Sequence, residues 1–179
     1  MPGHRRLLTT IVSVIAICGI LLAAVAHFAQ SEHNQAAPTA DIAPLFAASL
    51  PDTRGVSQPL AQWRGQVLIV NFWATWCPPC RDEMPELSAL HDKFHARGLS
   101  VLGIATDDVA KMQTFATEMQ VSYPLFAADL EGMPLAARLG NTRDVLPYTV
   151  LVGRDGKVVA SYVGRINSRA LEQALNPLL

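Results

Sequence analysis

The stretch QVLIVNFWATWCPPCRDEMPEL, residues 66–87, carries the strongest structural signals in the chain. It opens with a continuous apolar run, QVLIVNFWA, which is typical of a strand buried on both faces of a sheet. It leads into residues 78–97, where an initial proline and apolar residues at three- and four-residue spacing predict a helix packed on that sheet. Cys77 and Cys80 lie at the junction, which is the rim where open α/β sheets place their sites.

The segments that follow continue the alternation of strands and helices. Residues 99–106 form a second apolar run, which we expect to lie parallel to the first strand because the helix at 78–97 connects the two. Residues 148–152 and 157–163 flank the turn sequence GRDG, which predicts an antiparallel hairpin. Further helices are expected at about 108–120, near 133–139 and at 168–175. The order predicts an α/β fold with a central mixed sheet flanked by helices.

The first part of the chain, residues 1–29, predicts a membrane anchor. Arg5 and Arg6 precede an uncharged apolar run of 20 residues at 7–26. A helix of this length, rising ~1.5 Å per residue, spans a hydrocarbon core of roughly 30 Å. A cleaved signal peptide is the alternative, because the small residues at 24–26 could form a cleavage site. The two arginines place the rest of the chain across the membrane, which in a bacterium is the periplasm.

The remainder divides into a linker and one domain. Residues 30–43 are polar, rich in alanine and interrupted by Pro38, as in a linker. Residues 44–179 are long enough to bury a core, and residues 49–65 predict an added hairpin ahead of the first central strand. The net charge of −1 and the pI of about 6.5 give no electrostatic footprint for nucleic acid, so nucleic-acid binding is set aside.

Four kinds of site could use a Cys-x-x-Cys pair. Structural zinc needs four ligands, yet the chain has no second cysteine pair and no histidine after His95. Covalent haem attachment needs histidine directly after the second cysteine, where Arg81 stands. A purely structural disulfide across so short a loop restrains the unfolded chain little. A dithiol that cycles with a disulfide remains, and the helix N-terminus would lower the pKa of Cys77 and make it the attacking sulfur.

The two motifs FWATWCPPCRDEMPEL and LPYTVLVGRDGKVV resemble the thioredoxin fold, and specifically the membrane-tethered thiol-disulfide oxidoreductases of the TlpA, ResA and CcmG (DsbE) type. The resemblance covers residues 44–179. It implies that Cys77 is the nucleophile, that Cys80 is the resolving cysteine and that Pro147 is a cis-proline beside the disulfide. Glu83 matches a glutamate of that subgroup, which implies that it accepts and returns the proton of Cys80; a solvated surface glutamate is the alternative.

The resemblance also implies a surface that receives the substrate. Its expected residues are Trp76, Pro78, Pro79 and Leu146. One position departs from cytosolic thioredoxins, which carry a buried aspartate six residues before the nucleophile. Asn71 stands at that position and cannot exchange a proton at neutral pH, so Glu83 becomes the available carboxylate.

The implied activity is reduction of disulfides in client proteins, of the cytochrome c maturation or copper and oxidase assembly type. The implied location is the bacterial inner membrane, with a single span, a catalytic domain in the periplasm and a transmembrane electron donor of the DsbD/CcdA type. No cofactor beyond the Cys77–Cys80 couple and no metal are expected. A periplasmic disulfide oxidant or isomerase is the alternative, and a Cu(I)-binding metallochaperone is a third possibility.

Overall fold

The computed structural model describes residues 41–179. The predicted anchor at residues 1–29 and the predicted linker up to residue 40 lie outside the described residues. Within residues 41–179 no helix combines the length and apolar character needed to cross a membrane. Ile42 is part of a buried cluster and α2 (Ala43–Ala47) follows it directly, so packing begins at the end of the segment predicted as a linker.

The domain is built on a five-stranded mixed sheet with the order β5-β4-β3-β6-β7. The strands are β3 (Val67–Trp73), β4 (Leu99–Ala105), β5 (Leu125–Ala127), β6 (Tyr148–Val152) and β7 (Val158–Val163). β3 pairs in parallel with β4 and antiparallel with β6. Every residue of β3 is buried, which explains its unbroken apolar run. The mixed sheet agrees with the predicted thioredoxin-like α/β fold.

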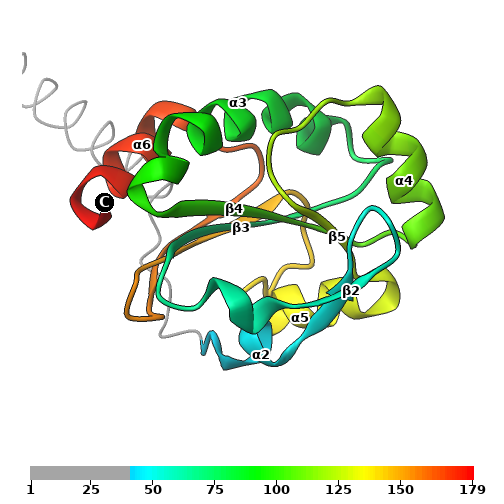
Figure 1. Ribbon diagram of the computed structural model, residues 1–179, viewed down its shortest axis with the longest axis horizontal. Helices are drawn as coiled ribbons and strands as arrows, with labels where there is room; N and C mark the ends of the chain where they lie inside the picture. Colours follow the sequence, from blue (N-terminus) through cyan, green and yellow to red (C-terminus); the bar gives the residue numbers. More distant parts are fainter. Residues whose placement is uncertain (1–40) are drawn as a thin grey trace, which may run out of the picture. The chain divides into compact units, whose positions relative to one another are not determined.

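Helices cover both faces of this sheet (Figure 1). The first face carries α3 (Pro78–Phe94), α4 (Val109–Glu118) and α6 (Ser168–Leu175), which share one buried apolar cluster. The opposite face carries α2 and α5 (Gly132–Arg138), which share a second cluster. The domain therefore has two cores, separated by the sheet, and the helix expected near residues 133–139 is α5.

Shorter elements complete the domain. β1 (Ser49–Pro51) pairs antiparallel with β2 (Ser57–Pro59) within the segment 49–65. The described residues also form four 3-10 turns: η1 (Leu60–Trp63), η2 (His95–Arg97), η3 (Asp129–Glu131) and η4 (Asn176–Leu178). η2 occupies the last turn of the helix predicted at 78–97, because Gly98 follows with a φ of 88° in the left-handed region that ends helices.

Candidate active site

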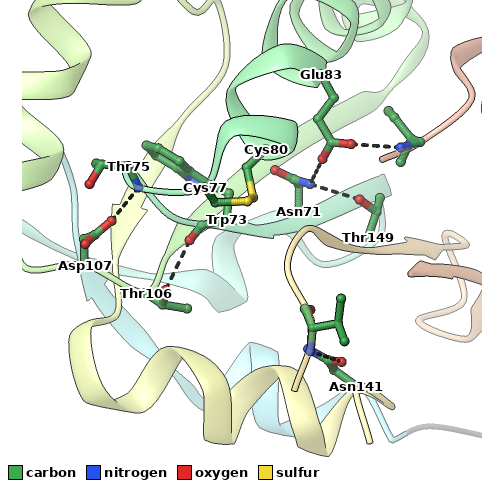
Figure 2. The surroundings of a disulfide bond; sticks show 12 residues. Asn71, Trp73, Thr75, Cys77, Cys80, Glu83, Thr106, Asp107, Asn141 and Thr149 are labelled. Atoms are coloured by element: carbon green, nitrogen blue, oxygen red, sulfur yellow. Dashed lines mark hydrogen bonds between the residues drawn. A yellow bond between two sulfur atoms is a disulfide. The ribbon is translucent and has the colours of Figure 1, made fainter. Parts of the chain in front are cut away.

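Cys77 and Cys80 form a disulfide at the N-terminal end of α3 (Figure 2). Cys77 is the N-cap residue of the helix, and its carbonyl accepts a hydrogen bond from the Arg81 N–H at 3.2 Å. Cys77 retains 5% exposure, whereas Cys80 is fully buried. The first N–H groups of a helix stabilise a negative charge beside them. A thiolate at Cys77 would therefore be both the better stabilised and the more accessible of the two.

Glu83 lies one helical turn beyond Cys80 and is completely buried. Its carboxylate accepts hydrogen bonds from Asn71 Nδ2 at 2.7 Å and from the Ile166 N–H at 2.9 Å. Burial raises the pKa of Glu83 from 4.5 to about 7, although these two hydrogen bonds and the charge of Arg165 act in the opposite direction. The alternative of a solvated surface glutamate is excluded by this burial, and the carboxyl exchanges a proton near neutral pH.

Asn71 connects three elements beneath the disulfide. It lies in β3, and its Nδ2 donates both to Glu83 on α3 and to Thr149 Oγ1 on β6, the latter at 3.0 Å (Figure 2). Asn71 Oδ1 is buried without a hydrogen-bond partner among the described residues. The amide presents only a donor to the carboxylate, which favours the ionised form of Glu83.

We expect Asn71→Asp to destabilise the protein more at pH 8 than at pH 5. The substitution places a second carboxylate beside Glu83 in a buried space, and two such groups cannot both ionise without a large cost. The pair then retains a proton to higher pH, so the stability present at pH 5 is lost as the pH rises. The extra loss at pH 8 should be about 2 kcal/mol, measured by urea unfolding at both pH values.

Gln113→Glu, an added charge on the exposed side of α4, serves as the control and should change stability little at either pH. An equal loss at pH 5 and pH 8 for Asn71→Asp would contradict the coupling with Glu83.

The loop that precedes β6 faces the cysteines. Its Leu146–Pro147 peptide bond is cis, and Pro147 is buried. The buried side chain of Asn141 holds this loop, since its Nδ2 donates to the Val145 carbonyl at 3.0 Å and its Oδ1 accepts from the Val145 N–H at 3.3 Å (Figure 2). The loop therefore has a defined path next to the disulfide.

A groove of about 720 Å³ opens beside the nucleophilic position. Its walls come from the Cys77 segment, the end of β4, helix α5 and the loop before Pro147. The lining residues are Trp76, Cys77, Pro78, Thr106, Met133, Pro134, Ala137, Asp144 and Leu146. Three of the four predicted substrate-binding residues thus meet in one groove, and Pro79 is exposed outside its lining.

Several residues of this region were not predicted as site residues. Asn141, Thr149 and the residues of α5 carry no local motif, because only the folded chain brings them to the cysteines. Asp108 caps α4 and accepts from the Lys111 N–H at 2.9 Å. Asp107 is buried and accepts the Thr75 N–H at 2.7 Å, which holds the segment before Cys77. The position of Asp107 directly after a central parallel strand is the sequence signal that could have marked it as a site residue, because open α/β sheets place their sites there.

Metal-binding residues do not gather in the described domain. The rings of His91 and His95 stack with centroids 5.7 Å apart on the helix surface. No group of three or more His, Cys, Asp or Glu side chains within residues 41–179 is arranged to hold a metal ion.

Comparison with known proteins gives a consistent picture. The sequence pattern of the AhpC/TSA family matches residues 39–161. Thiol-disulfide oxidoreductase ResA of Bacillus anthracis is 30% identical over 138 residues, which are 76% of each chain. A DsbE-like thiol:disulfide interchange protein of Chlorobium tepidum is 25% identical with a TM-score of 0.64, over 82% of this chain and 96% of that one. A secreted thiol-disulfide isomerase of Corynebacterium glutamicum is 26% identical with a TM-score of 0.65, over 79% and 84% of the two chains.

Proposed function

Because the chain belongs to the AhpC/TSA family and is a thiol-disulfide oxidoreductase of the ResA and DsbE-like type, we propose that it reduces disulfides in client proteins, with Cys77 as the nucleophile. Proteins of this type act on protein disulfides through their own redox-active cysteines. The observation that carries the proposal is the cysteine pair at the N-terminus of α3, with the buried Glu83 one turn further along the helix.

The reaction transfers two electrons from the dithiol to the client. The Cys77 thiolate attacks one sulfur of the client disulfide, and the other client sulfur leaves as a thiolate that takes up a proton. Cys80 then loses its proton and attacks the sulfur of Cys77 within the mixed disulfide. The second client thiolate leaves and is protonated, and the Cys77–Cys80 disulfide of the structure is the oxidised product.

Glu83 is the group that takes the proton of Cys80 in this scheme. Both residues are buried on α3, so water has little access to the thiol. A carboxyl whose pKa is raised to about 7 is matched to proton transfer near neutral pH. Pro147 and Leu146 would hold the client chain against the disulfide, and Trp76 and Pro78 would contact it in the same groove.

The cellular setting is part of the proposal. We propose a single-span anchor at residues 1–29 in a bacterial inner membrane, with residues 44–179 in the periplasm. A donor of the DsbD/CcdA type would return electrons to the disulfide, and clients would belong to cytochrome c maturation or to copper and oxidase assembly. The apolar run at residues 7–26, preceded by Arg5 and Arg6, supports the anchor and its orientation.

The direction of electron flow separates a reductase from an oxidant or an isomerase, and the Corynebacterium glutamicum relative is named as an isomerase. The test equilibrates the full-length protein with glutathione buffers and measures the fraction of the Cys77–Cys80 disulfide. We expect a reduction potential well below about −200 mV together with reduction of insulin. A potential near about −120 mV would contradict a reductase and identify an oxidant.

A further inference from the structure

We propose that the groove beside Cys77 selects clients that carry a lysine or arginine next to the disulfide cysteine, with an apolar residue on the other side of that cysteine. Asp144 would bind the basic side chain, and the apolar walls would receive its neighbour. This inference rests on the proposed function and names the class of substrate for the same site.

Apart from Cys77, the groove is lined by apolar residues, one threonine and one charged side chain. Among the described residues that line it, Asp144 alone carries an ionisable acidic or basic side chain. Thr106 is a polar member of the lining, and its Oγ1 is directed to the Trp73 carbonyl at 3.4 Å. A client segment that enters the groove of the reduced protein therefore meets two negative charges, the Cys77 thiolate and the Asp144 carboxylate, and Asp144 is the one placed to attract a basic residue beside the client cysteine.

The side chain of Asp144 is available to such a client. It is exposed, and none of the salt bridges and side-chain hydrogen bonds within residues 41–179 involves it. Five other surface acids within residues 41–179 each pair with a basic side chain: Asp52, Glu86, Asp108, Asp155 and Glu172. The acid at the groove is thus left open for a partner outside the chain.

The backbone holds Asp144 in place. Its φ is 51°, in the left-handed region that only glycine, asparagine and aspartate adopt readily. The next residue, Val145, is held at both its N–H and its carbonyl by the buried Asn141 side chain. The backbone therefore holds Asp144 at a defined place in the groove lining, which limits the positions that its carboxylate can occupy.

Most of the groove lining is apolar. Trp76 is 69% exposed, which is unusual for so large an apolar side chain, and it lies directly before Cys77. Met133, Pro134 and Ala137 form the wall contributed by α5. A leucine-sized side chain beside the client cysteine would cover part of this surface, and its burial would add to the attraction of Asp144.

The test uses three synthetic peptides, each with one intramolecular disulfide and a leucine before the first cysteine. They differ only after that cysteine, where they carry lysine, glutamine or glutamate. The reduced full-length protein is mixed with each peptide, and the second-order rate constant is measured at 20 mM and 500 mM NaCl. We expect the lysine peptide to react about 5-fold faster than the glutamate peptide at low salt. High salt should bring this ratio close to 1.

Asp144→Asn is the informative variant, because asparagine also tolerates the left-handed conformation and differs only in charge. The rate ratio of the lysine and glutamate peptides should fall to about 1 in this variant, and Asp144→Lys should invert it. Asp155→Asn, a charge removal at the exposed β6–β7 turn, is the matched control and should keep the wild-type ratio. A fourth peptide replaces the leucine of the lysine peptide by serine. This replacement should lower the rate constant of the wild-type protein by a larger factor than it lowers the rate constant of Met133→Gln.

Three results would overturn the inference. Equal rates for the lysine and glutamate peptides in the wild-type protein would show that the groove does not select clients by the charge beside the cysteine. A ratio that survives in Asp144→Asn would assign the selection to another residue. If the protein reduces none of the three peptides, the result would contradict the proposed function itself and therefore also the proposed selectivity.

Discussion

Replacing Cys77 with serine should abolish the reduction of insulin by the full-length protein, whereas Cys80→Ser should stop the reaction at a mixed disulfide. Cys77 retains exposure toward the groove and Cys80 is fully buried, so only Cys77 can reach a client disulfide first. Without Cys80 no internal sulfur can displace the client. Mass spectrometry of the Cys80→Ser protein mixed with a disulfide peptide should therefore show a covalent adduct close to one per molecule.

Cys18→Ser is the matched control for both variants. Cys18 is the only other cysteine of the chain, and its interpretation is that of a small apolar residue in the predicted anchor. Its substitution should leave the rate of insulin reduction within about 2-fold of the wild-type value. An adduct that forms on Cys80 in the Cys77→Ser protein would reverse the assignment of the two sulfurs.

Glu83→Gln should remove a large contribution to the pH dependence of stability of the oxidised protein between pH 4.5 and pH 8. The folded-state pKa of about 7 lies above the unfolded value of 4.5, so the folded protein binds the additional proton. The associated stability is complete below pH 4.5 and is lost as the pH rises past 7. The stability of the wild-type protein relative to Glu83→Gln should therefore fall by about 3 kcal/mol between pH 4.5 and pH 8, measured by urea unfolding.

The same variant has a kinetic consequence that a purely structural role would not produce. If Glu83 takes the proton of Cys80, the mixed disulfide should resolve about 100-fold more slowly in Glu83→Gln, and the inflection near pH 7 should disappear from the pH profile of resolution. Glu118→Gln removes an exposed carboxylate at the end of α4 and should keep the wild-type profile. An inflection near pH 7 that persists in Glu83→Gln would assign it to another group.

The central part of the fold could be predicted because its signals are local. The apolar run of β3 reflects burial on both faces, and the turn sequence between β6 and β7 marks an antiparallel pair. Helix ends were less predictable, since the α3 boundary depends on a 3-10 turn and on the left-handed Gly98. Helix propensity favours a continuous helix up to residue 97, but the left-handed backbone of Gly98 ends it with a 3-10 turn.

The site residues likewise divide into those that a local motif predicts and those that only the folded chain brings together. Cys77, Cys80 and Glu83 belong to one motif, so their proximity follows from a single helix. The burial of Glu83 does not follow from that motif, because it depends on the Ile166 N–H and on Asn71, far away in the sequence. Of the groove lining, only Cys77, Trp76, Pro78 and Leu146 were predicted as site residues. Its other wall, α5, approaches through tertiary packing that no spacing in the sequence reports.

The hydrogen bond from the Ile166 N–H to Glu83 Oε2 has an evolutionary consequence. A main-chain donor is supplied by every amino acid except proline, so residue 166 can drift in sequence without depriving the carboxylate of its partner. An insertion or deletion between β7 and α6 is different, because it would displace the donor itself and alter the acidity of a group in the redox centre. The length of that connection is therefore a feature that purifying selection should preserve for the acidity of Glu83.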